Sequence, residues 1–228
     1  MIQMIDDKIV EWLNYWESKD DSDPYKKIDH TKSTWYYRFI FLEKLFKSQD
    51  FRNKLVLDIG CGVGFYTDYL IKKWNAKVFS LDLAKRMLLS VNKRAYRIQG
   101  ALPCLPFKEA KFDYVLCVEV FQYIPDLMDS LVEINRVLKT GGILYFTTLN
   151  SDFIISKLRS GKNFKLNLIK RNRHELEYLL KKAGFEPVVE HIPVLPFMIP
   201  RFSMDLLGVI QRVGTLCNSV GGYAIKIE

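Results

Sequence analysis

Cysteine and histidine are scarce in this chain of 228 residues, which has four cysteines and three histidines. The cysteines, Cys61, Cys104, Cys117 and Cys217, form no Cys-x-x-Cys pair and have no histidine at zinc-ligand spacing. This pattern argues against a zinc site, and we expect no bound metal. Unpaired cysteines of this kind are typical of reduced core thiols in a cytoplasmic protein.

Long uninterrupted apolar runs are also missing. An apolar stretch at residues 192–210 is broken by three prolines, Arg201 and Asp205, and is too short for a membrane-spanning helix. The first eight residues carry acids early and lack the apolar stretch of a signal peptide. We therefore expect a cytoplasmic protein without a membrane span, for which peripheral membrane contact remains open. Residues 192–210 are interpreted as a lid over a pocket.

Phosphate-binding motifs are absent too, although a glycine-rich turn is present. Residues 55–64 read Leu-Val-Leu-Asp-Ile-Gly-Cys-Gly-Val-Gly, an apolar strand with Asp58 ahead of three glycines. No Gly-Lys-Ser/Thr ending follows, and Phe65 stands where the dinucleotide fingerprint needs a glycine. The Asp58 carboxylate would repel a pyrophosphate. It suits a positively charged ligand better, such as S-adenosylmethionine, which carries a sulfonium and an ammonium group and no phosphate.

Around this turn the chain resembles the class I S-adenosylmethionine-dependent methyltransferases, and most closely the type 11 branch that includes ubiquinone and menaquinone biosynthesis enzymes. The resemblance is close over residues 54–150 and looser after them. Its motifs occur in the family's order: Leu57-Asp58-Ile59-Gly60-Cys61-Gly62-Val63-Gly64, Lys77-Val78-Phe79-Ser80-Leu81-Asp82, Leu105-Pro106-Phe107, Phe112-Asp113-Tyr114-Val115 and Arg136-Val137-Leu138-Lys139-Thr140-Gly141-Gly142. The resemblance implies an enzyme that uses S-adenosyl-L-methionine and releases S-adenosyl-L-homocysteine.

The spacing of apolar residues predicts an α/β fold with alternating strands and helices. Strands are expected at residues 54–59, 77–81, 96–99, 112–118, 143–149, 186–192 and 222–227, and helices at 5–16, 35–46, 66–74, 84–93, 127–138 and 173–183. The resemblance implies a Rossmann-like three-layer sandwich whose seven-stranded, mostly parallel sheet takes its last strand antiparallel. We interpret residues 1–228 as one methyltransferase domain. In it, residues 1–50 form a helical N-terminal lid, 51–150 the cofactor-binding core and 151–228 the substrate-side elements and last two strands.

Cofactor-binding residues are expected beyond the carboxyl ends of the strands. Asp82 ends the second predicted strand, where a carboxylate can accept both ribose hydroxyl protons; the alternative is that it caps the next helix. Met87 would lie against the adenine or pack in the core. Ala101 stands where relatives often have an aspartate that binds the adenine amino group. The full expected set is Asp58, Gly60, Cys61, Gly62, Asp82, Leu83, Met87, Ala101, Leu102, Val118, Glu119 and Arg38.

Two members of this set have competing interpretations. Glu119 follows the fourth predicted strand and faces either the methionine end of the cofactor or the substrate; alternatively it is a solvated acid at a helix start. Arg38 lies on an N-terminal helix, where some relatives place a basic residue on the cofactor carboxylate. The alternative for Arg38 is an exposed helical arginine.

The sequence leaves the catalytic residue open. Methyl transfer needs a base only when the accepting atom must lose a proton. The candidates are Tyr123, which stands where many relatives have histidine, His30 and Glu119. Holding the two reactants in line and excluding water can supply much of the catalysis.

The acceptor molecule is the least determined feature. Aromatic and apolar residues crowd the N-terminal helices and residues 197–207, which favours a small, partly apolar molecule. The net charge of +8 includes a basic segment at residues 157–182, which leaves an RNA or protein methyltransferase as an alternative. No RNA-binding module is recognised, so a nucleic-acid substrate is disfavoured. A cofactor-binding module without transfer activity is the third interpretation, and the chain is expected to be a monomer or a homodimer.

Overall fold

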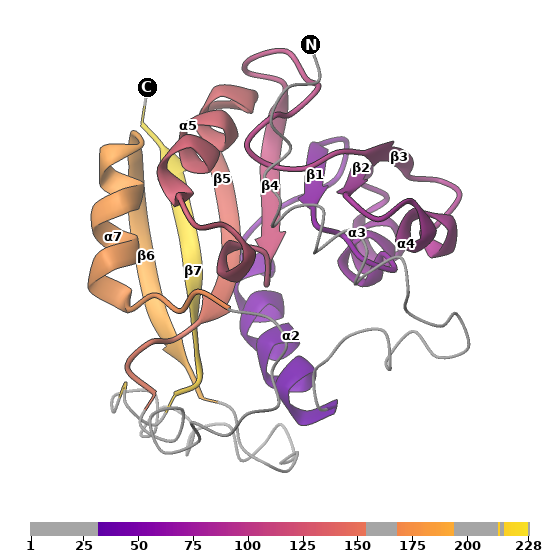
Figure 1. Cartoon of the computed structure of the whole chain (residues 1–228). Helices are drawn as coiled ribbons and strands as arrows, with labels where there is room; N and C mark the ends of the chain where they lie inside the picture. The colour runs from indigo at the N-terminus through magenta and orange to yellow at the C-terminus, as the bar shows by residue number, and fades with distance from the viewer. Residues whose placement is uncertain (1–31, 154–167, 194–213, 215–216, 228) are drawn as a thin grey trace.

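A computed structural model describes residues 32–153, 168–193, 214 and 217–227, and shows a mixed sheet flanked by helices (Figure 1). The strands are β1 (Leu55–Ile59), β2 (Lys77–Asp82), β3 (Tyr96–Gln99), β4 (Phe112–Val118), β5 (Leu138–Leu149), β6 (Phe185–Ile192) and β7 (Ser219–Lys226). The helices are α2 (Lys32–Phe46), α3 (Phe65–Trp74), α4 (Lys85–Ser90), the short 3-10 helix η1 (Phe121–Tyr123), α5 (Leu127–Val137) and α7 (Arg173–Lys182).

The sheet has seven strands in the order β3-β2-β1-β4-β5-β7-β6. β1, β2, β3, β4 and β5 pair in parallel, whereas β7 lies between β5 and β6 and is antiparallel to both. The predicted insertion of an antiparallel last strand is confirmed. Because β5 and β6 both oppose β7, the carboxyl ends of all strands except β7 lie at one edge of the sheet. In such sheets, ligands bind at this edge.

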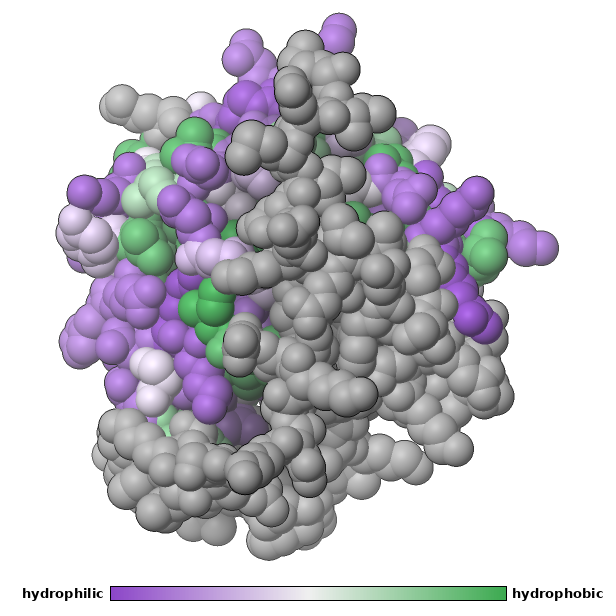
Figure 2. Space-filling model, in the orientation of Figure 1, coloured by the Kyte–Doolittle hydropathy of each residue, from purple (hydrophilic) through white to green (hydrophobic). Residues whose placement is uncertain are grey.

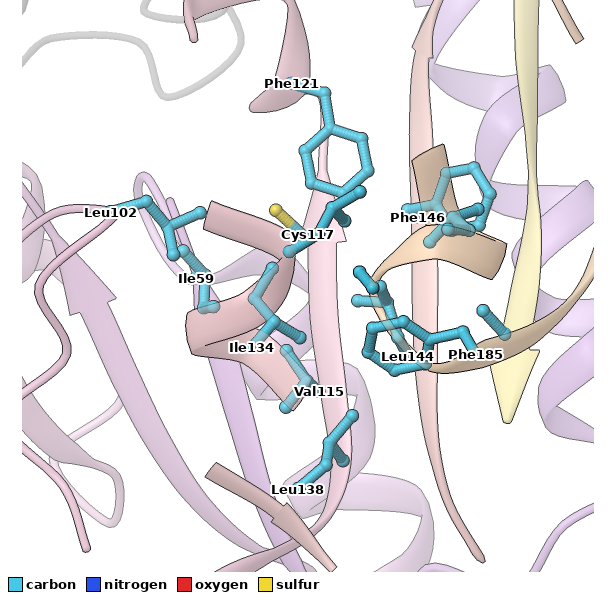
Figure 3. Close-up of a cluster of buried hydrophobic side chains, with 14 of the residues drawn as sticks. Ile59, Leu102, Val115, Cys117, Phe121, Ile134, Leu138, Leu144, Phe146 and Phe185 are labelled. Carbon is cyan, nitrogen blue, oxygen red and sulfur yellow. The ribbon is translucent and has the colours of Figure 1, made fainter. Parts of the chain in front are cut away.

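Apolar side chains cover both faces of the sheet and give the three layers predicted. On one face, β4 and β5 pack against α5 and α7 through buried residues such as Leu131, Ile134, Leu176 and Leu180. Figure 3 shows part of this cluster, with Val115, Cys117, Leu144 and Phe146 from the strands and Ile134 and Phe121 facing them. On the other face, residues of α2, α3 and α4 form a second cluster, which includes Leu42, Phe46, Leu70, Ile71 and Leu88.

The outer surface of α7 is mostly polar. α7 exposes Arg173, His174, Glu175, Lys181 and Lys182, which agrees with the predominance of hydrophilic residues on the left side of the face in Figure 2. Among the described residues, no helix combines the length and apolar character that crossing a bilayer requires. No group of three or more His, Cys, Asp or Glu side chains in this part of the chain is arranged to hold a metal ion.

The structure corrects several predicted boundaries. α4 ends at Ser90, before the predicted residue 93, because Val91 adopts an extended conformation. β7 begins at Ser219, before the predicted residue 222, and includes Gly221 and Gly222. A Cβ on Gly222 would lie 1.9 Å from the Val188 carbonyl oxygen, so this glycine permits the close approach of β7 to β6.

The predicted core cysteines and the predicted N-terminal helix and lid have different outcomes. All four cysteines are free, but Cys104 is exposed and therefore not a core thiol as predicted. It follows the turn at Leu102-Pro103, outside the sheet. The predicted helix at residues 5–16 and most of the lid at 192–210 lie outside the described residues.

Candidate cofactor site

The glycine turn after β1 has the backbone geometry that its sequence predicts. Gly60, Gly62 and Gly64 all have positive φ, at 64°, 52° and 84°, a region that only glycine enters without strain. The amide of Gly60 donates to the Leu81 carbonyl at 2.7 Å, which fixes the turn against β2. A Cβ on Gly60 would lie 2.4 Å from Val120 Cγ2, whereas a Cβ on Gly62 would meet none of the described residues within 4 Å. Within the part of the chain that the structure describes, Gly62 therefore faces open space.

Asp58 lies under this turn and is 2% exposed. The Thr67 hydroxyl contacts Asp58 Oδ2 at 2.7 Å and Ser80 Oγ at 2.7 Å. Burial, together with the nearby Asp82 charge, raises the pKa of Asp58 to about 7, although the Thr67 hydrogen bonds act to lower it. A buried carboxyl group that titrates near neutral pH would be stabilised in its charged form by a cationic ligand.

Asp82 combines two structural roles at the end of β2. Its Oδ1 accepts a hydrogen bond from the Ala84 amide at 2.9 Å, and its Oδ2 accepts one from the Gly62 amide at 2.8 Å. The first bond closes a turn before α4 and is not a helix cap, because the N-cap residue of α4 is Ala84 and has no side-chain cap hydrogen bond. The second bond ties the glycine turn to β2. A carboxylate oxygen can accept more than one hydrogen bond, so ribose binding by Asp82 stays a prediction.

Arg38 on α2 is buried, and the alternative of an exposed helical arginine is wrong. It is 2% exposed, its Nη2 lies 3.0 Å from Glu119 Oε2, and its Nε and Nη2 donate to Ser219 Oγ at 3.1 and 2.8 Å. The remaining nitrogen, Nη1, is buried and finds no acceptor among the described residues. A buried guanidinium donor without an acceptor is costly, and a bound carboxylate would remove that cost.

Glu119 likewise is not the solvated acid of the alternative interpretation. Its side chain is 12% exposed and accepts hydrogen bonds from Thr147 Oγ1 at 2.8 Å and Gln122 Nε2 at 3.1 Å. Its φ is +60°, an unusual value for a residue with a Cβ. The Glu119 amide donates to the Thr147 carbonyl at 2.9 Å, so β5 holds this strained turn in place.

These charges converge around Tyr66 at the start of α3. Burial raises the pKa of the Tyr66 phenol, with Arg38 lowering it and Glu119 and Asp58 raising it. Burial, and then the charges of Asp58 and Asp82, raise the pKa of the Cys61 thiol. The fold thus brings two acids, a buried ion pair and the glycine turn together at the carboxyl edge of the sheet.

The other predicted site residues lie on the loops of the same edge or on α4. Met87 and Leu102 are buried, at 4% and 7% exposure, and Leu83, Ala101 and Val118 are partly buried. Of the catalytic candidates, Tyr123 ends η1 and is partly buried, Glu119 is in the ion pair, and His30 lies outside the described residues.

Sequence reasoning missed the polar residues that hold the site together. Thr67, Thr147 and Ser219 come from α3, β5 and β7 and contact Asp58, Glu119 and Arg38 respectively. Isolated threonines and serines carry no signal of this kind, because their partners are fixed only when the strands and helices meet.

Comparisons with known proteins agree with this geometry. Residues 57–146 match a family model described as a methyltransferase domain. A ubiquinone biosynthesis O-methyltransferase of Paracidovorax citrulli (strain AAC00-1) is 26% identical over 183 residues, which cover 74% of this chain and 71% of that protein. For four further curated relatives, the matched part spans 64%, 50%, 63% and 54% of their length.

Solved structures share the fold at low sequence identity. An S-adenosylmethionine-dependent methyltransferase from Mesorhizobium loti has a TM-score of 0.63 at 14% identity, over 83% of this chain and 97% of that one. A phosphoethanolamine N-methyltransferase of Haemonchus contortus, solved with phosphomonomethylethanolamine and S-adenosylhomocysteine, has a TM-score of 0.64 at 20% identity, over 85% and 53% of the two chains. Together with the seven-stranded sheet and the glycine turn, the methyltransferase-domain match at residues 57–146 and the methyltransferase relatives support the assignment of this chain as an S-adenosylmethionine-dependent methyltransferase.

Proposed function

We propose that this protein transfers the methyl group of S-adenosylmethionine to a small, partly apolar acceptor. The observation that carries the cofactor assignment is the pairing of a buried guanidinium donor without an acceptor among the described residues with a buried carboxyl group, both close to Tyr66. Arg38 has a buried donor without an acceptor among the described residues, and Asp58 is a buried carboxyl group with a pKa of about 7. A zwitterionic amino-acid moiety would satisfy both, with its carboxylate at Arg38 and its positive groups nearer the acids.

When bound, the cofactor supplies a methyl group already activated by the positive sulfur. The residues of this chain then have to bind and orient it. Gly60 and Gly62 would allow close approach of the main chain, Asp82 would meet the ribose, and Met87 and Leu102 would offer apolar surface for the adenine. Tyr123 is placed on η1, beyond β4, where it would orient the acceptor through its hydroxyl group.

Two observations favour a small acceptor over an RNA. The relative from Paracidovorax citrulli is named as an O-methyltransferase of ubiquinone biosynthesis, which favours a small acceptor. The basic segment offers less to an RNA than its sequence indicates. Arg171 is 2% exposed, and Arg173 Nε forms an ion pair with Glu177 Oε1 at 2.7 Å. Monomeric or dimeric state and cytoplasmic location stay predictions.

Two measurements test this proposal. Calorimetry with S-adenosylmethionine tests the cofactor, and undetectable binding at millimolar concentration would refute the proposal as a whole. A methyl-donor turnover assay against small-molecule metabolite pools and against total RNA tests the acceptor. Activity confined to RNA would refute the small-molecule assignment, whereas binding without any turnover would favour the non-catalytic module.

The adenine subsite yields a separate prediction. Ala101 has no side-chain acceptor for the adenine amino group, and it lies in a short bridge with Cys104 beside β3. Ala101→Asp is expected to tighten S-adenosylmethionine binding about fivefold, the value of one net hydrogen bond of about 1 kcal/mol. Calorimetry of the two proteins gives the comparison. Unchanged affinity would mean that the adenine does not lie beside residue 101.

A further inference from the structure

Arg171, a buried arginine, forms hydrogen bonds to the main chain of the loop that follows β4. Arg171, two residues before α7, donates from Nη1 to the Phe121 carbonyl at 2.8 Å and from Nη2 to the carbonyls of Ile124 and Pro125 at 2.7 and 3.0 Å. These three acceptors belong to η1 and the two residues that follow it. The side chain of Arg171 is 3% exposed, and its ion-pair partner Glu175 Oε1 lies 3.4 Å from its Nε.

The main chain beside Arg171 strengthens the same connection. The Ile169 amide donates to the Gln122 carbonyl at 2.9 Å, and the Arg171 amide donates to the Leu149 carbonyl at 3.1 Å. Residues 169–171 therefore lie between η1 and the carboxyl end of β5. Any displacement of this segment would act on η1 through several hydrogen bonds at once.

η1 in turn contacts the ion pair of the cofactor site. Gln122 on η1 donates from Nε2 to Glu119 Oε2 at 3.1 Å, and its Oε1 accepts from Thr148 Oγ1 at 3.2 Å. Glu119 pairs with Arg38, whose Nη1 is the buried donor without an acceptor among the described residues. A continuous series of contacts thus links Arg171 to the proposed binding point of the cofactor carboxylate.

We propose that Arg171 is a positioning residue that holds η1, so that Glu119 and Arg38 are fixed for the methionine end of the cofactor and Tyr123 for the acceptor. This inference rests on the proposed function. A guanidinium suits the task because its planar fork reaches several carbonyls, which the single ammonium of a lysine does not. Burying a guanidinium against neutral acceptors is costly, and a residue needed only for packing could be apolar.

The inference is tested with Arg171→Lys and a matched control, Arg173→Lys. Arg173 lies on the exposed side of α7, with a side chain that is 46% exposed and pairs with Glu177. Its replacement is therefore the same arginine-to-lysine change at a position that does not contact η1. We expect Arg171→Lys to weaken S-adenosylhomocysteine binding about tenfold in calorimetry, the effect of losing one or two charge-assisted hydrogen bonds. Arg173→Lys should leave it within about twofold. Equal affinity of Arg171→Lys and the unmodified protein would overturn the inference.

A double-mutant cycle separates positioning from general destabilisation. If Arg171 acts through η1 on Glu119, Arg171→Lys should have little further effect in a Glu119→Gln background. Additive losses of affinity would show that Arg171 is merely structural. Should Arg171→Lys fail to fold, Ile169→Pro offers a second test, because proline lacks the amide that donates a hydrogen bond to the Gln122 carbonyl. This variant is expected to weaken S-adenosylhomocysteine binding in the same way. Unchanged binding by that variant would count against the inference.

Hydrogen exchange of the ligand-free proteins gives an independent readout. The amides of Tyr123 and Ile124 bond within the η1 turn, and we expect them to exchange faster in Arg171→Lys while the amides of β4 keep their rates. Unchanged exchange at η1 would overturn the role of Arg171. Absence of cofactor binding by the unmodified protein would instead refute the proposed function, so the two failures are distinguishable.

Discussion

Gly62→Ala is expected to weaken S-adenosylmethionine binding about 30-fold or more, the effect of forcing one extra methyl group into a packed contact. The physical reason is specific to this glycine. A Cβ at Gly62 meets no atom of the described residues within 4 Å, so within this part of the chain a steric conflict arises only with a ligand. Calorimetry with the cofactor measures the loss.

Gly141→Ala is the matched control for this experiment. Gly141 also has a positive φ, at 72°, and a Cβ there also meets nothing within 4 Å. It lies near the start of β5, at the opposite edge of the sheet. Both variants should lose about 1 kcal/mol of unfolding free energy from the strained backbone. Only Gly62→Ala should lose the cofactor. Equal binding by the two variants would show that nothing approaches the glycine turn.

Cofactor affinity is expected to fall as pH is lowered below 7, by about tenfold per pH unit, as linkage to a single proton requires. The free carboxyl group of Asp58 has a pKa of about 7, and a bound cation should lower that pKa. Binding then releases a proton below pH 7, and the affinity should level off above it. Calorimetry at pH values from about 5.5 to about 8 measures the affinity on both sides of the Asp58 pKa of about 7.

Asp58→Asn should abolish this pH dependence and weaken binding about 30-fold or more at pH 8, because a buried partner of the cation loses its charge. Asp113→Asn is the control. Asp113 accepts from the Leu55 amide and pairs with Lys139, at the opposite end of β1 and β4, and its loss should leave the pH dependence intact. A pH dependence that survives in Asp58→Asn would assign the titration to another group.

The stability of the ligand-free protein should fall as the pH rises, whereas the cofactor affinity should rise. The pKa of Asp58 is raised on folding from 3.8 to about 7, so the folded state binds a proton more tightly than the unfolded state. The contribution of Asp58 to the free energy of unfolding is fully present below pH 3.8, the pKa of the unfolded state, and is lost as the pH rises through 7. Asp58→Asn should therefore become stabilising relative to the native protein above pH 7. Thermal unfolding across this range provides the measurement.

The sequence by itself determined the local units of the protein. These units depend only on neighbouring residues: apolar strands that carry Asp58 and Asp82 near their ends, and glycines that permit positive φ. The structure confirms β1, β2, β3 and β4 within a residue or so of the predicted bounds. The family resemblance supplied the number of strands in the sheet and the antiparallel last strand. Neither follows from periodicity alone, because pairing between strands depends on distant parts of the chain.

Only the tertiary structure decided which polar side chains form the site. Arg38 and Ser219 are 181 positions apart and share a hydrogen bond, and Glu119 meets Arg38 only because β4, β7 and α2 come together at one edge. The same holds for Arg171, which the sequence places in a basic, solvated segment and the fold buries against three carbonyls. Burial and charge pairing belong to surfaces that form when elements pack, so no local pattern of residues can specify them.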